Sequence, residues 1–186
     1  MRRSRTAIRS PIARLTIATA WLAGLTAVVP AAAAQGPVAL GIGGGVTVPR
    51  DRLEGAADRG YHGQLTLRLG VPLVPVHGRI DALHARLGGA PGSAADFAVS
   101  GLTASLGIDV VPLAVASMYV VGGAGYYWSR WDGPDAERVR RAGWNAGAGV
   151  RLSLGAVRLF GEARYHVVRG DAGAVHFVPF TIGAIF

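Results

Sequence analysis

The chain has 186 residues, enough for one domain, and a formal net charge of +8. It has no cysteine, which excludes a disulfide framework, a thiolate zinc site and a cysteine nucleophile. Five of its 19 basic residues and none of its 11 acids lie in residues 1–34, so residues 35–186 carry a net charge of only +3. This small surplus gives little support for nucleic-acid binding.

Residues 1–34 have the order of a secretory signal peptide. Arginines come first, from Arg2 to Arg14, and the apolar stretch from Leu15 to Val29 follows. After this stretch come Ala32-Ala33-Ala34, the small residues that a signal peptidase needs. We therefore predict a signal peptide at 1–34, cleaved before Gln35, and one domain at 35–186. The alternative is an uncleaved membrane anchor, which the small residues at the end of the segment disfavour, because an anchor has no cleavage site.

From residue 38 onward, apolar residues alternate with polar or small ones. The period of two is typical of β-strands with two different faces. Eight segments show it, each of roughly ten residues, which is the length that a tilted membrane-spanning strand needs. They cover residues 38–48, 61–71, 76–87, 97–110, 116–128, 143–154, 157–168 and 175–186.

The segment 61–71 shows the clearest alternation, with Leu65 and Leu67 on one face and Gln64 and Arg68 on the other. Lipid tails cannot pair with backbone N–H and C=O groups, so a sheet in a membrane must close into a barrel. Alternate residues then face lipid and lumen. The phase of the segment 116–128 stays open, because both of its faces contain apolar residues.

The connections between the segments alternate in length. Those at 49–60, 88–96, 129–142 and 169–174 are longer and polar, whereas those near Pro72–Pro75, Pro112 and Gly155 are short. Short turns at one end, long loops at the other and an even strand count are typical of transmembrane barrels. We predict an all-β fold: an eight-stranded antiparallel up-and-down transmembrane β-barrel with both termini on the short-turn, periplasmic side.

Aromatic residues support this arrangement, since amphipathic rings gather at the headgroup level of a membrane. Six of them fall at the long-loop ends of the predicted strands, where we expect an outer girdle. They are Tyr61, Phe97, Tyr126, Trp128, Trp144 and Tyr165.

Two other folds fit parts of the pattern. Residues 110–129 contain no charge and are long enough for a transmembrane helix, but Pro112 and three glycines disfavour a helix. A soluble eight-stranded barrel would turn its apolar face inward, and alternation by itself does not distinguish it from a membrane barrel. The long apolar face, the aromatic residues and the C-terminal Phe186 favour the membrane barrel.

Three stretches, 143–151, 160–166 and 179–186, resemble the small OmpA/OmpX-type outer-membrane β-barrel domains. The resemblance covers essentially residues 36–186 and implies an outer-membrane location. In that superfamily the barrel-assembly machinery reads a C-terminal Phe preceded by alternating apolar residues, which gives this role to Phe180, Ile182 and Phe186. Ala184 departs from the pattern, because an aromatic residue is common there. The fold hosts many functions, so the resemblance assigns no activity.

The charged residues of the predicted inner face are the candidate site: Arg68, Arg79, Asp81, Arg151, Glu162 and Arg164. Eight strands leave a lumen just wide enough for side chains, and charges inside it must be paired. We therefore interpret this set as a structural network that plugs the lumen, in preference to a catalytic cluster.

No cofactor or metal is expected. The histidines are scattered, and the glycine runs lack a following Lys-Ser/Thr and helix. One type of lipid A-modifying barrel uses a His/Ser/Glu set on its outer face. Here Glu162 and His166 share the inner face and no serine follows His166, so the required geometry is missing.

We therefore expect a monomeric, non-enzymatic outer-membrane barrel with a structural or surface-interaction role. A lipid-modifying barrel enzyme and a small channel remain the alternatives. The expected partners are outer-membrane lipid and lipopolysaccharide, and the barrel-assembly machinery during biogenesis; nucleic acid is not expected. The charged run from Arg130 to Arg141, in the third long loop, fits a solvated loop; its functional alternative is contact with lipopolysaccharide phosphates or with a partner.

Overall fold

The computed structural model describes residues 37–70, 74–89, 96–112, 115–132, 138–170 and 173–186. The predicted signal peptide at 1–34 lies outside this part of the chain. A short 3-10 turn, η3 (Asp51–Leu53), follows the first of eight strands. The strands are β1 (Val38–Arg50), β2 (Ala57–Gly70), β3 (Val76–Gly89), β4 (Phe97–Pro112), β5 (Ala116–Trp131), β6 (Val139–Leu154), β7 (Val157–Val168) and β8 (Val175–Ile185).

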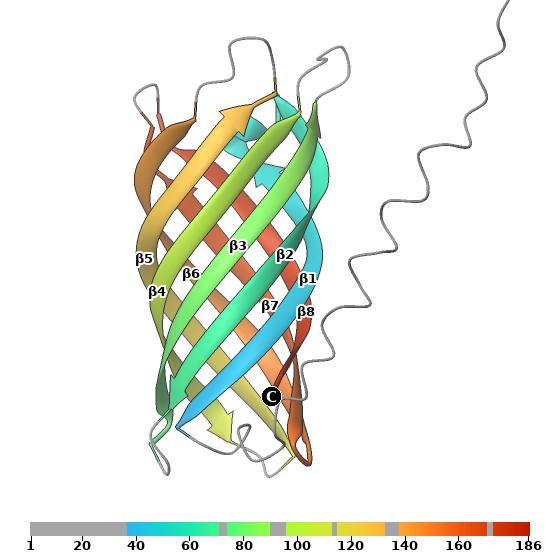
Figure 1. Ribbon diagram of the computed structural model, residues 1–186, viewed down its shortest axis with the longest axis vertical. Helices are drawn as coiled ribbons and strands as arrows, with labels where there is room; N and C mark the ends of the chain where they lie inside the picture. Colours follow the sequence, from blue (N-terminus) through green and yellow to red (C-terminus); the bar gives the residue numbers. More distant parts are fainter. Residues whose placement is uncertain (1–36, 71–73, 90–95, 113–114, 133–137, 171–172) are drawn as a thin grey trace, which may run out of the picture.

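Each strand pairs antiparallel with the next, and β8 pairs with β1, so the sheet closes into a barrel (Figure 1). The closing pair runs from Gly41 opposite Ile185 to Arg50 opposite His176. Closure leaves no strand edge unpaired. The predicted eight-stranded antiparallel fold is therefore confirmed.

The helix alternative for residues 110–129 is wrong. This region contains the end of β4 and most of β5, which pair with each other along their length. Valine and tyrosine favour an extended backbone, whereas Pro112 cannot donate the hydrogen bond that a helix interior needs. Among the described residues, no helix is both long enough and apolar enough to span a membrane.

The two ends of the barrel differ in the length of their connections. At the short-turn end, β6 and β7 are joined by two residues, and the first of these, Gly155, has a φ of +63° that glycine adopts without strain. The start of β1 and the C-terminus lie at this same end (Figure 1). At the long-loop end the strands reach further than predicted: β2 begins at Ala57, β5 ends at Trp131 and β6 begins at Val139.

The two faces of the sheet have opposite polarity over most of its height. Leu65, Leu106 and Ile182 are among the exposed apolar residues of the outer face, while Thr66, Ser105 and Thr181 are buried inside. This polarity is the reverse of that of a soluble barrel. The phase of β5 is also decided, since Tyr119 and Tyr127 are buried inside and Met118 and Tyr126 are exposed outside.

The interior contains an apolar cluster toward each end, and at the short-turn end Arg68 and Arg151 lie opposite Ala39 and Phe160 in the strand register. At the long-loop end, ten buried side chains form one cluster, which we call the upper cluster: Leu53, Ala57, Leu83, Ala85, Leu87, Phe97, Val99, Tyr127, Val168 and Phe177. At the short-turn end a smaller, lower cluster contains Ala39, Phe160 and Ile185.

The expected position of Phe97 in the outer aromatic girdle is wrong. Its side chain is only 3% exposed and belongs to the upper cluster, where it packs against the Trp131 ring at 4.8 Å. Phe97 has the same parity along β4 as the buried Thr103, so it faces inward. The other five aromatic residues have the outward parity, and Tyr61, Tyr126 and Trp144 are exposed.

Candidate functional site in the lumen

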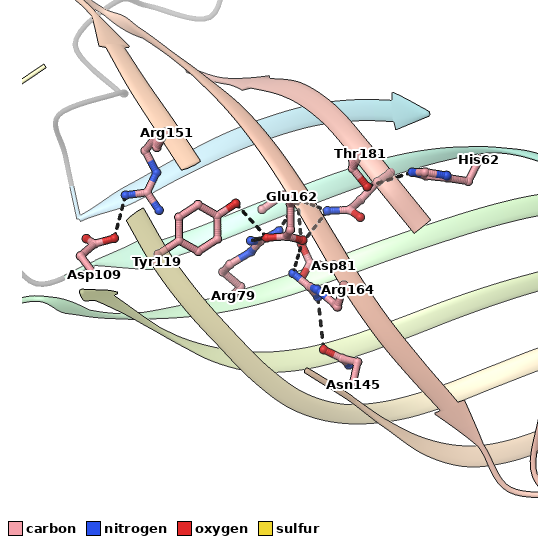
Figure 2. A network of polar contacts seen from close by, with 12 residues as sticks. His62, Arg79, Asp81, Asp109, Tyr119, Asn145, Arg151, Glu162, Arg164 and Thr181 are labelled. Atoms are coloured by element: carbon pink, nitrogen blue, oxygen red, sulfur yellow. Dashed lines mark hydrogen bonds and ion pairs between the residues drawn. The ribbon is translucent and has the colours of Figure 1, made fainter. Parts of the chain in front are cut away.

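Four charged side chains from β3 and β7 form a closed ring of ion pairs in the lumen (Figure 2). Arg79 contacts Glu162 Oε2 at 2.6 Å and Asp81 Oδ1 at 2.9 Å. Arg164 contacts Asp81 Oδ2 at 2.9 Å and Glu162 Oε1 at 2.7 Å. All four residues are buried, and their charges cancel within the ring.

The strand register explains why these four residues meet. Arg79 and Asp81 are two positions apart on β3, and Glu162 and Arg164 are two positions apart on β7, so each pair shares the inner face. Three strands separate β3 from β7 in either direction around the barrel, so the two pairs face each other across the lumen. Arginine side chains are long enough to cross this narrow space.

Neutral side chains complete the coordination of the two carboxylates. The Tyr119 hydroxyl donates to Glu162 Oε2 at 2.9 Å, and the Thr66 hydroxyl donates to Asp81 Oδ1 at 2.7 Å. Gly149 makes room for Tyr119, because a Cβ at this position would lie 2.5 Å from the tyrosine ring. Every carboxylate oxygen of the ring therefore has at least one donor or cationic partner.

A second charged group lies nearer the short-turn end. Asp109 accepts a hydrogen bond from Arg151 at 3.1 Å and lies 3.9 Å from the Arg68 guanidinium. The Arg151 guanidinium also lies over the Tyr119 ring, 4.7 Å from its centroid. Tyr119 thus links the two charged groups, since it contacts Glu162 of the ring and Arg151 of the second group.

Histidines connect the ring to the upper cluster. His62 bonds the hydroxyls of Thr47 at 3.0 Å and Thr181 at 2.9 Å. His166 bonds the Tyr127 hydroxyl at 2.9 Å and stacks on Phe177 with a centroid distance of 4.9 Å. The polar middle of the lumen therefore passes directly into its apolar upper part.

The structure places all six predicted site residues on the inner face. It brings Arg79, Asp81, Glu162 and Arg164 together, and it separates Arg68 and Arg151 into the group around Asp109. Tyr119 is not among the predicted site residues, because the sequence leaves the phase of β5 open. The signal that identifies it is parity: Tyr119 is an even number of positions from the inward Gly123 and Gly125.

This arrangement favours pairing of charge over catalysis. Each acid of the ring is held between two guanidinium groups, so neither is available as a general acid or base. Glu162 and His166, the residues weighed for a lipid-modifying enzyme, are both buried inside the barrel. Within the described ranges, no group of three or more His, Cys, Asp or Glu residues could hold a metal ion.

The three residues of the predicted assembly signal lie at the end of the chain. Phe180 and Ile182 are exposed on the outer face of β8. The backbone N–H and C=O of Phe186 bond Leu40 of β1, at 2.7 and 3.1 Å, and so continue the closing pair. Their recognition by the assembly machinery stays a prediction.

Comparison with known proteins identifies the fold. No family model and no curated protein matches the sequence. Among solved structures, Neisserial surface protein A (NspA) matches with a TM-score of 0.69 at 14% identity, over 81% of this chain and 96% of that one. The attachment invasion locus protein Ail of Yersinia pestis matches with a TM-score of 0.54 at 16% identity, over 80% and 97%. The chain therefore has the fold of the small, eight-stranded OmpA/OmpX-like outer-membrane β-barrels.

Proposed function

We propose that the protein is a monomeric, non-enzymatic barrel of the bacterial outer membrane with a closed lumen. Its role is to anchor the long-loop end at the cell surface, where it supports the envelope or makes surface contacts. Both termini then lie in the periplasm. The observation that carries this proposal is the set of buried side chains in the lumen: an ion-pair ring in the middle, an apolar cluster at the long-loop end, and charged and apolar residues side by side at the short-turn end.

The outer face supports the membrane location. Leu106 and Ile182 are 66% and 77% exposed, and in water such a surface would be a site of aggregation. In a bilayer it contacts lipid, and the exposed Tyr61, Tyr126 and Trp144 lie at the depth of the headgroups. The names of the two similar barrels, a surface protein and an attachment protein, agree with a position at the bacterial surface.

The buried side chains of the lumen support a closed barrel over a channel. A water-filled path would have to pass both the ring and Leu87, Tyr127 and Phe177 of the upper cluster, which are at most 1% exposed. Opening it would separate buried opposite charges, which is costly in a medium of low dielectric constant.

Two measurements test the proposal. Since the chain has no cysteine, single cysteines report the orientation of each end. Gly55→Cys at the long-loop end should react with a membrane-impermeant maleimide on intact cells, and Ala156→Cys in the β6–β7 turn only after the outer membrane is permeabilised. The reverse labelling would overturn the orientation.

The second measurement is conductance in planar bilayers. The unmodified protein should give no steady ion current. A steady current would contradict the closed lumen and support the channel alternative. Turnover of labelled lipid A by the purified barrel would instead support the lipid-modifying enzyme.

A further inference from the structure

Arginine side chains line the long-loop edge of the outer apolar face on β3 to β6; we call them the arginine row. The row contains Arg86 of β3, Arg130 of β5, Arg140 of β6 and Arg138, which directly precedes β6. Three of these arginines, Arg130, Arg138 and Arg140, fall in the loop predicted at 129–142. Because β5 and β6 are longer than predicted, Arg130 and Arg140 instead belong to the sheet and face outward.

The strand register holds the row together. Arg86 lies opposite Ala98, which lies opposite Arg130, so two strand spacings of about 4.8 Å separate these arginines. Arg140 lies opposite Trp128, and its guanidinium lies 4.3 Å from the centroid of the Tyr126 ring. A guanidinium that lies over an aromatic ring can still donate hydrogen bonds from the N–H groups at its edge.

Among the described residues, only one arginine of the row has an acidic partner. Arg130 lies 3.4 Å from Asp132, and both side chains are about 40% exposed. Arg86, Arg138 and Arg140 form no ion pair with an acid in the described part of the chain, and all three are exposed. Guanidinium groups at the boundary of an apolar surface are suited to bind phosphates.

An apolar groove of about 590 Å³ lies directly below the row on the outer face. Small residues line it: Ala82 lies between the larger Leu65 of β2 and Leu102 of β4, and Gly63 lies opposite His84 one level higher. Its upper edge is the row of paired residues His84, Ser100 and Trp128, in which His84 bonds the Ser100 hydroxyl at 2.9 Å. Arg86 is two residues beyond His84 on the same face of β3, so the groove and the arginine row are adjacent.

We propose that the arginine row and the groove together form a binding site for lipopolysaccharide. The lipid phosphates contact Arg86 and Arg140, and one acyl chain lies in the groove. This inference rests on the proposed outer-membrane orientation, which puts the row in the outer leaflet. Arginines on three strands, spread from β3 to β6, suit a headgroup with several phosphates better than a phospholipid, which has one.

The first test removes charge. Wild-type protein, Arg86→Gln/Arg140→Gln and the control Arg50→Gln/Arg52→Gln are compared for binding of purified lipopolysaccharide in detergent micelles. Arg50 and Arg52 are exposed at the same end, but on β1 and η3, away from the row, and the charge change is the same. The Arg86/Arg140 variant should bind about tenfold more weakly or worse, and the control within about twofold of wild type.

The second test fills the groove without changing charge. Ala82→Trp should weaken lipopolysaccharide binding about as strongly as the loss of the two arginines, because the indole occupies the space of the acyl chain. Ala146→Trp is the matched control, since Ala146 is exposed on the outer face of β6 and does not line the groove. Its binding should equal that of wild type.

Three outcomes would overturn the proposal: binding unchanged in both variants, equal binding of lipopolysaccharide from which the phosphates are removed, or equally strong binding of phosphatidylglycerol. The last would identify a general site for anionic lipids. Heat-modified mobility in gels checks that every variant is folded. These tests are independent of the proposed outer-membrane orientation. An error in that orientation would change the cysteine labelling, whereas an error in the proposed lipopolysaccharide site would change binding in micelles.

Discussion

At the scale of single residues, the lumen shows how buried charges are accommodated. Each carboxylate of the ring contacts two guanidiniums, and each guanidinium contacts two carboxylates, so every ionised group has opposite charge on two sides. Removing one member leaves its neighbours buried without compensation, which costs more than the ring contributes as a whole. The ring should therefore respond to mutation as a unit.

Glu162→Gln should lower the free energy of unfolding by about 3–5 kcal/mol, because Arg79 and Arg164 are then left with Asp81 alone. Glu162→Gln combined with Arg164→Gln should recover part of this loss. Denaturant unfolding in micelles gives the double-mutant cycle. Asp132→Asn is the control, since its ion pair with Arg130 is exposed and should contribute at most about 1 kcal/mol. Strictly additive losses at Glu162 and Arg164 would contradict a coupled ring.

At the scale of the strand, the two faces have different requirements. The outer face only has to be apolar, whereas the inner face has to pair its charges and fill its volume. Two sets of substitutions measure these requirements separately.

Leu67→Arg and Val150→Arg should strongly impair membrane insertion. Both residues belong to the apolar outer face, where an arginine at mid-depth costs about 2–4 kcal/mol. Gly55→Arg, in the connection before β2, should be tolerated, because a side chain there meets nothing within 4 Å. Yields of folded protein in a membrane-assembly assay give the comparison. Equal yields for all three variants would favour a soluble barrel.

Two phenylalanines on β8 separate stability from assembly. Phe177 is fully buried in the upper cluster, so Phe177→Ala should lower the free energy of unfolding in micelles by about 3–5 kcal/mol. Phe180 is 48% exposed, and detergent fills the space that Phe180→Ala leaves, so its loss should be smaller. If Phe180 belongs to the assembly signal, Phe180→Ala should reduce the amount of assembled barrel in cells more than Phe177→Ala does. Normal assembly of Phe180→Ala would remove it from that signal.

At the scale of the whole molecule, the proposed function requires export before folding. The Ala32-Ala33-Ala34 run predicts a mature N-terminus at Gln35, two residues before the first described residue. N-terminal sequencing of the protein from membranes should therefore begin at Gln35. Protein that still begins at Met1 would show that residues 1–34 are not a cleaved signal.

The polarity of the molecule changes along its axis. Over most of its height the barrel is apolar outside and polar inside, but near the long-loop end this order is reversed. On β3, Ile80 faces outward and Asp81 inward, whereas further along the same strand Arg86 faces outward and Leu87 inward. We infer that the reversal marks the level at which the barrel leaves the membrane, since an apolar interior and a charged exterior suit a sheet in water.

The sequence by itself determined the strands, their closure and most of their faces, because a period of two is a local property and lipid admits no unpaired strand edge. It was insufficient where both faces are apolar. Tyr119 is placed only by its parity with Gly123 and Gly125, and the position of Phe97 near the end of its strand does not reveal that its side chain faces inward. Both residues face inward because closure turns one parity of every strand toward the lumen.

Only the tertiary structure decided which charges meet. Residues 79 and 162 are 83 positions apart, and their contact depends on the register of all the strands between β3 and β7. The arginine row likewise needs the registers of β3 to β6, which bring together residues from 86 to 140. A residue pattern encodes the face on which a side chain lies, but the identity of its partner across the barrel is a consequence of closure and strand tilt.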